Sequence, residues 1–118
     1  MLKRLITLVG LVVMLWFGVW NFPAWTGEMA TGSQIFSANC ASCHIGGNNV
    51  ILKDKTLQQS ALEKYLDRYN EEPLAAVIYQ VSHGKNAMPA FGGRLTDEEI
   101  RDVVTYVLRQ AEQNWKDS

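Results

Sequence analysis

The feature that most constrains this 118-residue chain is its only cysteine pair, which lies in the motif Cys40-x-x-Cys43-His44. Two thiols three positions apart can add to the two vinyl groups on one edge of a porphyrin, and the next residue can bind the iron through its imidazole. The motif therefore predicts one haem c, attached covalently through Cys40 and Cys43, with His44 as an axial ligand. A domain with this motif folds around a porphyrin.

Three other uses of a cysteine pair are weighed against haem attachment. A thioredoxin-type redox pair belongs to a βαβ unit, and the sequence shows no such pattern. A zinc site needs four ligands from Cys and His, and nothing places His83, the only other histidine, near the motif. An exported chain can also join such a pair in a disulfide. The histidine directly after Cys43 favours haem attachment over all three.

The N-terminus has the pattern of a secretory signal peptide. Lys3 and Arg4 precede an uncharged, apolar run over residues 5–20, as in the basic and apolar regions of such peptides. This run is shorter than the roughly 20 apolar residues that span a bilayer. We therefore predict a cleaved signal peptide, 1–26, and a cytochrome c domain, 27–118. The alternative is a retained membrane anchor.

The charge balance argues against a nucleic-acid partner. The chain has 11 basic and 12 acidic residues, and loss of Lys3 and Arg4 leaves 9 basic residues and a net charge of −3. Binding to nucleic acid needs a clustered basic surface. The remaining domain of about 90 residues has a thin core, which is typical of chains that need a staple or a cofactor. We expect a soluble monomer after cleavage of the signal peptide.

Apolar spacing and capping residues predict an all-α domain of four helices. The longest apolar stripe comprises Ile100, Val103, Val104, Val107, Leu108 and Ala111. A second stripe runs from Leu74 to Val81, with Gly84 as its terminator, and a shorter one runs from Leu57 to Leu66. Three predicted helix starts match capping boxes, namely Thr31-x-x-Gln34, Thr56-x-x-Gln59 and Thr96-x-x-Glu99. The fourth predicted start is Asn70, with Pro73 in the first turn of the helix. Glycine-rich segments at 46–49 and 84–95 are predicted to be loops.

The sixth iron ligand is predicted to be Met88. Met1 and Met14 fall in the predicted signal peptide, and Met29 lies at the start of the domain. Met88 precedes a proline in a loop between two helices, well separated from His44, and Met/His ligation raises the reduction potential of a haem. Iron with both axial positions filled has no place for peroxide or oxygen, so we predict an electron carrier and no enzyme. A haem peroxidase would require that Met88 does not bind iron.

Two segments carry a resemblance to a known family. Residues 35–44, Ile-Phe-Ser-Ala-Asn-Cys-Ala-Ser-Cys-His, resemble the haem-binding helix of class I cytochromes c. Residues 79–81, Tyr-Gln-Val, followed by 84–95, Gly-Lys-Asn-Ala-Met-Pro-Ala-Phe-Gly-Gly-Arg-Leu, resemble cytochrome c6 of oxygenic phototrophs, also called cytochrome c-553 or soluble cytochrome f. The similarity covers residues 27–115. It implies a class I cytochrome c fold, with four helices wrapped around one covalently bound haem c.

The resemblance also implies partners, a location and roles for two further residues. The carrier would take electrons from the cytochrome b6f complex to photosystem I in the thylakoid lumen, with a terminal oxidase as a further acceptor and the periplasmic space as the alternative location. Gln80 would lie beside the haem, and Arg94 would dock on photosystem I. His83 stands where an asparagine is common in that family.

Two surface predictions and one competing function remain. We expect His83 to be a solvated residue near a helix C-terminus, with a pH-sensitive docking contact as the alternative. Trp115 is predicted to pack against the core. The competing function is a membrane-anchored haem relay domain that feeds an oxidase, which an uncleaved N-terminal segment would require.

Overall fold

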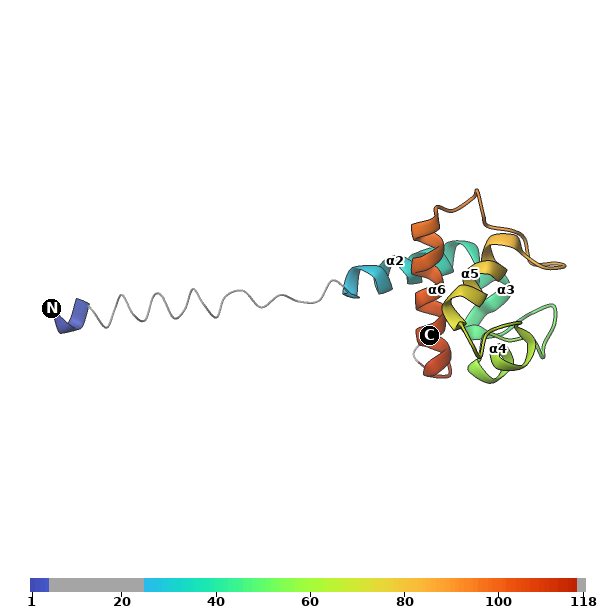
Figure 1. The fold of residues 1–118 in the computed structure, drawn as a ribbon, viewed down its shortest axis with the longest axis horizontal. Helices are drawn as coiled ribbons and strands as arrows, with labels where there is room; N and C mark the ends of the chain where they lie inside the picture. Colours follow the sequence, from blue (N-terminus) through green and yellow to red (C-terminus); the bar gives the residue numbers. More distant parts are fainter. Residues whose placement is uncertain (5–24, 117–118) are drawn as a thin grey trace.

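The computed structural model describes residues 1–4 and 25–116, and this part of the chain is helical without β-strands. The elements are α2 (Trp25–Asn39), α3 (Ala41–His44), the 3-10 helix η1 (Ile45–Gly47), α4 (Gln59–Tyr65), α5 (Pro73–His83) and α6 (Asp97–Glu112) (Figure 1). The prediction of an all-α domain is therefore confirmed. The predicted first helix is divided at Cys40, where the chain turns from α2 into α3.

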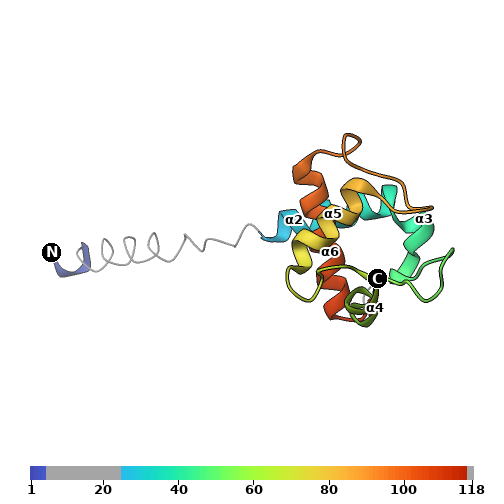
Figure 2. The same ribbon diagram turned by 45° about the vertical axis from the view of Figure 1, so that its right-hand side comes forward.

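The frame of the domain is the crossing of its first and last long helices. Figures 1 and 2 show α2 running across α6, with α5 on the other side of α6. The helices approach closely at Gly32, where a Cβ atom would lie 2.4 Å from the Asp102 carbonyl oxygen and 2.8 Å from Tyr106 Cβ. Only glycine leaves room for this contact. The crossing fixes the direction in which α2 leads into the cysteine motif.

The core lies against α6. Its largest fully buried side chains are Ile100, Val103 and Val104, all from this helix and each at most 2% exposed. Further core residues come from α2, α4, the segment between α4 and α5, α5, α6 itself and the chain after α6, namely Phe36, Leu62, Tyr69, Ala76, Val77, Val107, Ala111 and Trp115. The apolar stripe predicted for α6 is thus the one that organises the core.

The predicted capping box at the start of α6 is confirmed. The Thr96 hydroxyl accepts a hydrogen bond from the Glu99 backbone N–H at 3.1 Å, and the Glu99 carboxylate accepts one from the Thr96 N–H at 2.8 Å. Asp97 and Glu98 complete an acidic first turn, which the positive end of the helix dipole favours.

The capping box predicted at Thr31 is wrong. The chain is already helical from Trp25, so Thr31 lies inside α2 and has no free backbone N–H groups to cap. The intervening Glu28, Met29 and Ala30 all have good helix propensity, and they extend the helix toward the N-terminus. The helix also runs through the predicted cleavage point between residues 26 and 27.

The helix starts predicted at Thr56 and Asn70 are also wrong, because in both cases the helix begins a few residues later. Thr56 Oγ1 accepts a hydrogen bond from the Gln58 N–H at 3.3 Å, which forms a turn, and α4 begins only at Gln59. Asn70 donates from Nδ2 to the Glu63 carbonyl instead of capping a helix. The next helix begins at Pro73, which has no N–H to satisfy and fits the first helical position.

The N-terminal predictions lie mostly outside the described residues. Residues 5–24, which include the apolar run, are not described, so the division into 1–26 and 27–118 stays a prediction. Across positions 1–4 and 25–116, no helix is both long enough and apolar enough to cross a membrane.

Candidate haem site

The cysteine motif forms one tight turn at the end of α2. The backbone N–H groups of Cys43 and His44 both donate to the Cys40 carbonyl, at 3.1 Å and 2.9 Å. Both thiols are free and half-buried. A three-residue spacing on such a turn brings the two sulfur atoms to the same side of the backbone, as attachment to one porphyrin edge requires.

The Cys40 thiol lies in the more apolar surroundings of the two. Burial, with a smaller contribution from the nearby Cys43, raises the pKa of Cys40 to about 11. Cys40 packs against the core, and its backbone N–H donates to the Phe36 carbonyl at 2.8 Å. This thiol is therefore protonated at neutral pH, which protects it from adventitious metals and oxidants.

The His44 ring is held in one orientation by the backbone. Nδ1 lies 2.9 Å from the Asn48 carbonyl oxygen, and because a carbonyl only accepts, Nδ1 carries the hydrogen. The Asn48 N–H and Nδ2 in turn donate to the Ile45 carbonyl at 3.1 Å and 3.2 Å. Nε2 is left as the ring nitrogen with a free lone pair, which is the form that binds iron.

Met88 lies in a compact turn that is fastened to the end of α5. Lys85 and Met88 exchange two backbone hydrogen bonds of 3.0 Å, and the Phe91 N–H donates to the Val81 carbonyl at 2.9 Å. Gly84 begins the turn with a φ of +67°, and a Cβ atom there would lie 2.5 Å from the Met88 carbonyl oxygen. Gly84 is thus the helix terminator that the sequence predicted, and it also lets the Met88 turn fold back closely.

Gln80 contacts the predicted sixth ligand. Its Nε2 lies 4.0 Å from the Met88 sulfur, with the amide as donor. Both side chains are half-buried. The contact joins α5 to the Met88 turn, so a residue on a helix controls the position of a ligand on a loop.

Arg94 and His83 lie on the surface beside this turn. The Arg94 guanidinium carbon is 5.3 Å from the centre of the Phe91 ring, so the exposed cation lies over the ring of a buried aromatic residue. His83 ends α5 as an exposed residue, with Nδ1 2.9 Å from the Tyr79 carbonyl and its ring stacked on the Tyr79 ring at 4.1 Å. The sequence predicted the exposure and the helix end, and it missed the aromatic stack.

The donor set of this region suits haem c. It offers two free thiols on one turn, an imidazole with its Nε2 available and a thioether that is half-buried. Among the described positions, no group of three or more His, Cys, Asp or Glu residues is arranged so that it could hold a metal ion. Cys40 and Cys43 would hold the porphyrin, and His44 and Met88 would bind the iron.

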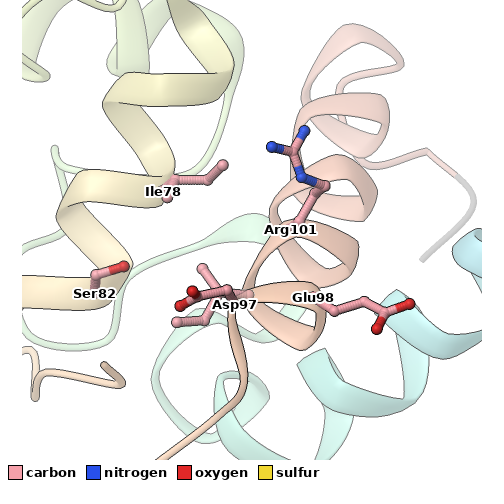
Figure 3. A pocket seen from close by; sticks show the side chains of 6 residues that line it. Ile78, Ser82, Asp97, Glu98 and Arg101 are labelled. Carbon is pink, nitrogen blue, oxygen red and sulfur yellow. The ribbon is translucent and has the colours of Figure 1, made fainter. Parts of the chain in front are cut away.

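A surface hollow lies elsewhere on the described chain. It encloses about 360 Å³ between α5 and the first turns of α6. Figure 3 shows the Asp97 and Ser82 side chains directed into it, while Glu98 points away. None of the four predicted haem-binding residues lines it. Two acidic groups and one arginine make it a polar surface hollow, with no thiol, imidazole or thioether.

Sequence reasoning missed the residues that support His44. Asn48 acts through its backbone carbonyl, and every residue has one, so residue type gave no indication of its role. Asn49 is more specific, because its side chain accepts from the N–H groups of Ile51 and Leu52 at 3.0 Å and 2.8 Å and donates to the Lys55 carbonyl at 2.9 Å. The Gly-Gly-Asn-Asn segment indicated a turn, without indicating these contacts.

Comparisons with known proteins agree with this donor set. Residues 27–107 match the family model described as "Cytochrome C oxidase, cbb3-type, subunit III". The chain is 49% identical over 115 residues to cytochrome c6 of Thermostichus vulcanus, covering 98% of each chain, and 55% identical over 89 residues to cytochrome c6 of Limnospira maxima, covering 75% of this chain and all of that one. The solved structure of cytochrome c6 from the diatom Phaeodactylum tricornutum superposes with a TM-score of 0.69 at 55% identity, covering 74% of this chain and 98% of that one.

Proposed function

The chain belongs to the cytochrome c6 family of electron-carrying cytochromes, and from this premise we propose that it carries single electrons from the cytochrome b6f complex to photosystem I. The observation that carries the proposal is the position of Met88, the predicted second axial ligand, in a turn that is hydrogen-bonded to α5 and contacted by Gln80. A bound haem c supplies a one-electron ferric/ferrous couple. With His44 and Met88 as ligands, the chain offers no open coordination site for a substrate.

The charge around the Met88 turn supports a docking role. Residues 73–96 contain no Asp or Glu, although the whole chain has 12 of them. Lys85 and Arg94, both exposed, are the charged residues of this segment, and the exposed His83 adds a titratable group. A locally positive surface next to the ligand favours partners with acidic docking faces, and such encounters are fast and short-lived.

The location follows from the proposed processing. The cytochrome c6 of Limnospira maxima is matched over its whole length by 89 residues of this chain, which supports a domain that functions without residues 1–26. We therefore propose a soluble carrier in the thylakoid lumen, with a terminal oxidase as a further acceptor. N-terminal sequencing of the native protein tests this: a start near Gly27 is expected, whereas a start at Met1 in the membrane fraction would favour the anchored relay.

Flash kinetics test the electron route. The reduced holoprotein is mixed with photosystem I particles, and re-reduction of the photo-oxidised donor is followed against protein concentration. We expect a rate that rises with the concentration of this protein and falls with added salt, because attraction between opposite charges is screened. In a second arm, reduced cytochrome b6f should reduce the ferric protein. A rate with photosystem I that does not depend on this protein would overturn the route.

A further inference from the structure

Trp115 occupies an unusual position directly after α6. Asn114 and Trp115 have φ values of +53° and +55°, in the left-handed region that residues other than glycine rarely adopt. Two successive residues in this region cost free energy, and the surrounding contacts must maintain them. The conformation turns the chain back on itself, so that the Trp115 side chain is buried, with only 6% exposed.

The indole is bonded to the loop that follows the haem motif. Trp115 Nε1 donates to the Leu57 carbonyl at 3.0 Å, across 58 positions of sequence. The Leu57 N–H in turn donates to the Gly47 carbonyl at 2.7 Å. The same ring covers Gly47, where a Cβ atom would lie 2.4 to 2.5 Å from three indole carbons. The end of α6 also lies beside α4 and η1 (Figures 1 and 2).

Gly47 is close to the predicted proximal ligand in the chain. It ends η1, the short 3-10 turn after His44, and it precedes Asn48, whose carbonyl accepts the His44 Nδ1 hydrogen. Gly47 itself has a φ of +75°, which glycine adopts without strain, and the indole packed against it leaves no room for a side chain. Trp115 therefore holds, from one side, the segment that orients the imidazole.

We infer that Trp115 is a positioning residue for the proximal axial ligand: it fixes the Gly47–Asn48 turn and thereby the hydrogen bond that the Asn48 carbonyl accepts from His44. This inference rests on the proposed ligation of haem c by His44. A carbonyl that accepts from Nδ1 makes the imidazole a stronger donor to iron and so stabilises the ferric state. Loss of the Trp115 contacts would loosen that hydrogen bond and raise the reduction potential.

Ordinary packing explains only part of what is observed. Trp115 contacts the rings of Phe36 at 5.2 Å and Tyr106 at 6.2 Å, and these contacts alone would account for its burial. They do not require the Nε1 hydrogen bond to Leu57. The two roles separate experimentally, because a side chain can keep the ring contacts while it loses the indole N–H.

The test compares Trp115→Phe with Thr96→Ala in the haem-loaded protein. Thr96→Ala is the matched control, since it weakens the opposite end of the same helix and does not touch the Gly47 turn. The readouts are the midpoint potential and the hyperfine-shifted NMR signals of the His44 ring in the ferric state. We expect Trp115→Phe to increase the ferrous-to-ferric ratio at a fixed applied potential about 2- to 12-fold, the range of one net hydrogen bond, and to move the His44 signals. Thr96→Ala should lower stability and leave both readouts unchanged.

A second replacement isolates the N–H group in case the phenylalanine variant does not fold. Incorporation of 3-benzothienylalanine at position 115 keeps the bicyclic shape and replaces the N–H with sulfur. The same rise in the ferrous fraction is expected. If either folded protein keeps the wild-type potential and His44 signals, Trp115 is only a packing residue and the inference is overturned. This test uses no partner complex. Its outcome is therefore independent of the result obtained with photosystem I, and the two proposals can fail separately.

Discussion

Replacement of Gln80 by valine should lower the reduction potential without changing the iron ligands. The amide Nε2 donates toward the Met88 sulfur at 4.0 Å. A donated hydrogen bond draws electron density from the thioether, and ferric iron loses more from this than ferrous iron. The wild-type contact therefore raises the potential, and its removal should let the potential fall.

The magnitude follows from the geometry. A thioether is a weak acceptor, and a contact of 4.0 Å to sulfur is long, so the bond belongs at the lower end of the usual net range, about 0.5 to 1 kcal/mol. For a one-electron couple, a tenfold change in the equilibrium constant corresponds to a change of about 59 mV in the reduction potential. The expected fall for Gln80→Val is therefore about 20 to 40 mV.

A spectroelectrochemical titration of wild type and variant measures this shift, and the weak near-infrared band from sulfur to iron reports whether Met88 stays bound. Valine also makes the site less polar, beside Val77 and Val81, and a less polar site disfavours ferric iron, which opposes the fall. Gln80→Asn is the matched control, because its shorter amide keeps the polarity and loses the reach. Its potential should fall at least as far. A midpoint that stays or rises in both variants, with the band intact, would refute the role of Gln80.

Three further changes test the ligand, the docking surface and the frame. Met88→Ala should abolish the near-infrared band and let the ferrous protein bind carbon monoxide; a wild-type protein without the band at neutral pH would show that Met88 is not the ligand. Arg94→Glu should slow the bimolecular reduction of photosystem I at low ionic strength with an unchanged haem spectrum, and an unaltered rate would make Arg94 an ordinary surface residue. Thr96→Ala removes the capping box of α6 and should lower the free energy of unfolding by about 1 kcal/mol, measured by denaturant titration; a loss below 0.3 kcal/mol would contradict this, as that is less than such caps contribute.

The sequence predicted the helical frame where local chemistry alone decides it. At Thr96 the side chain caps the start of α6, and at Gly84 the absence of a side chain allows the positive φ that ends α5. Both helix ends are therefore determined by the residue itself. Thr31 and Thr56 have equally good local patterns, and neither caps a helix. At Thr31 the preceding residues continue the helix, and at Thr56 the hydroxyl closes a turn first. A capping pattern shows that a helix can begin at a residue, and the neighbouring segments decide whether it does.

The haem-binding residues were predictable for a different reason from the residues that support them. Cys40, Cys43, His44 and Met88 carry side chains whose chemistry is rare in a chain with two cysteines and two histidines. The support for His44 comes from the Asn48 carbonyl and, through Gly47, from the distant Trp115. Backbone acceptors have no sequence pattern, and a contact across 58 positions becomes visible only in the fold.

The two predicted axial ligands, His44 and Met88, are held in place by different kinds of structure. His44 is fixed within a few residues of its own position, by the Asn48 carbonyl and by backbone bonds to Cys40. Met88 depends on a turn that is tied to α5 and lies within residues 73–96, which contain no Asp or Glu. A partner that docks on this positive segment contacts the Met88 side of the site first. Docking and the proposed distal ligand are therefore coupled through one turn, while the proposed proximal ligand is held by its own neighbours and, through Gly47, by Trp115.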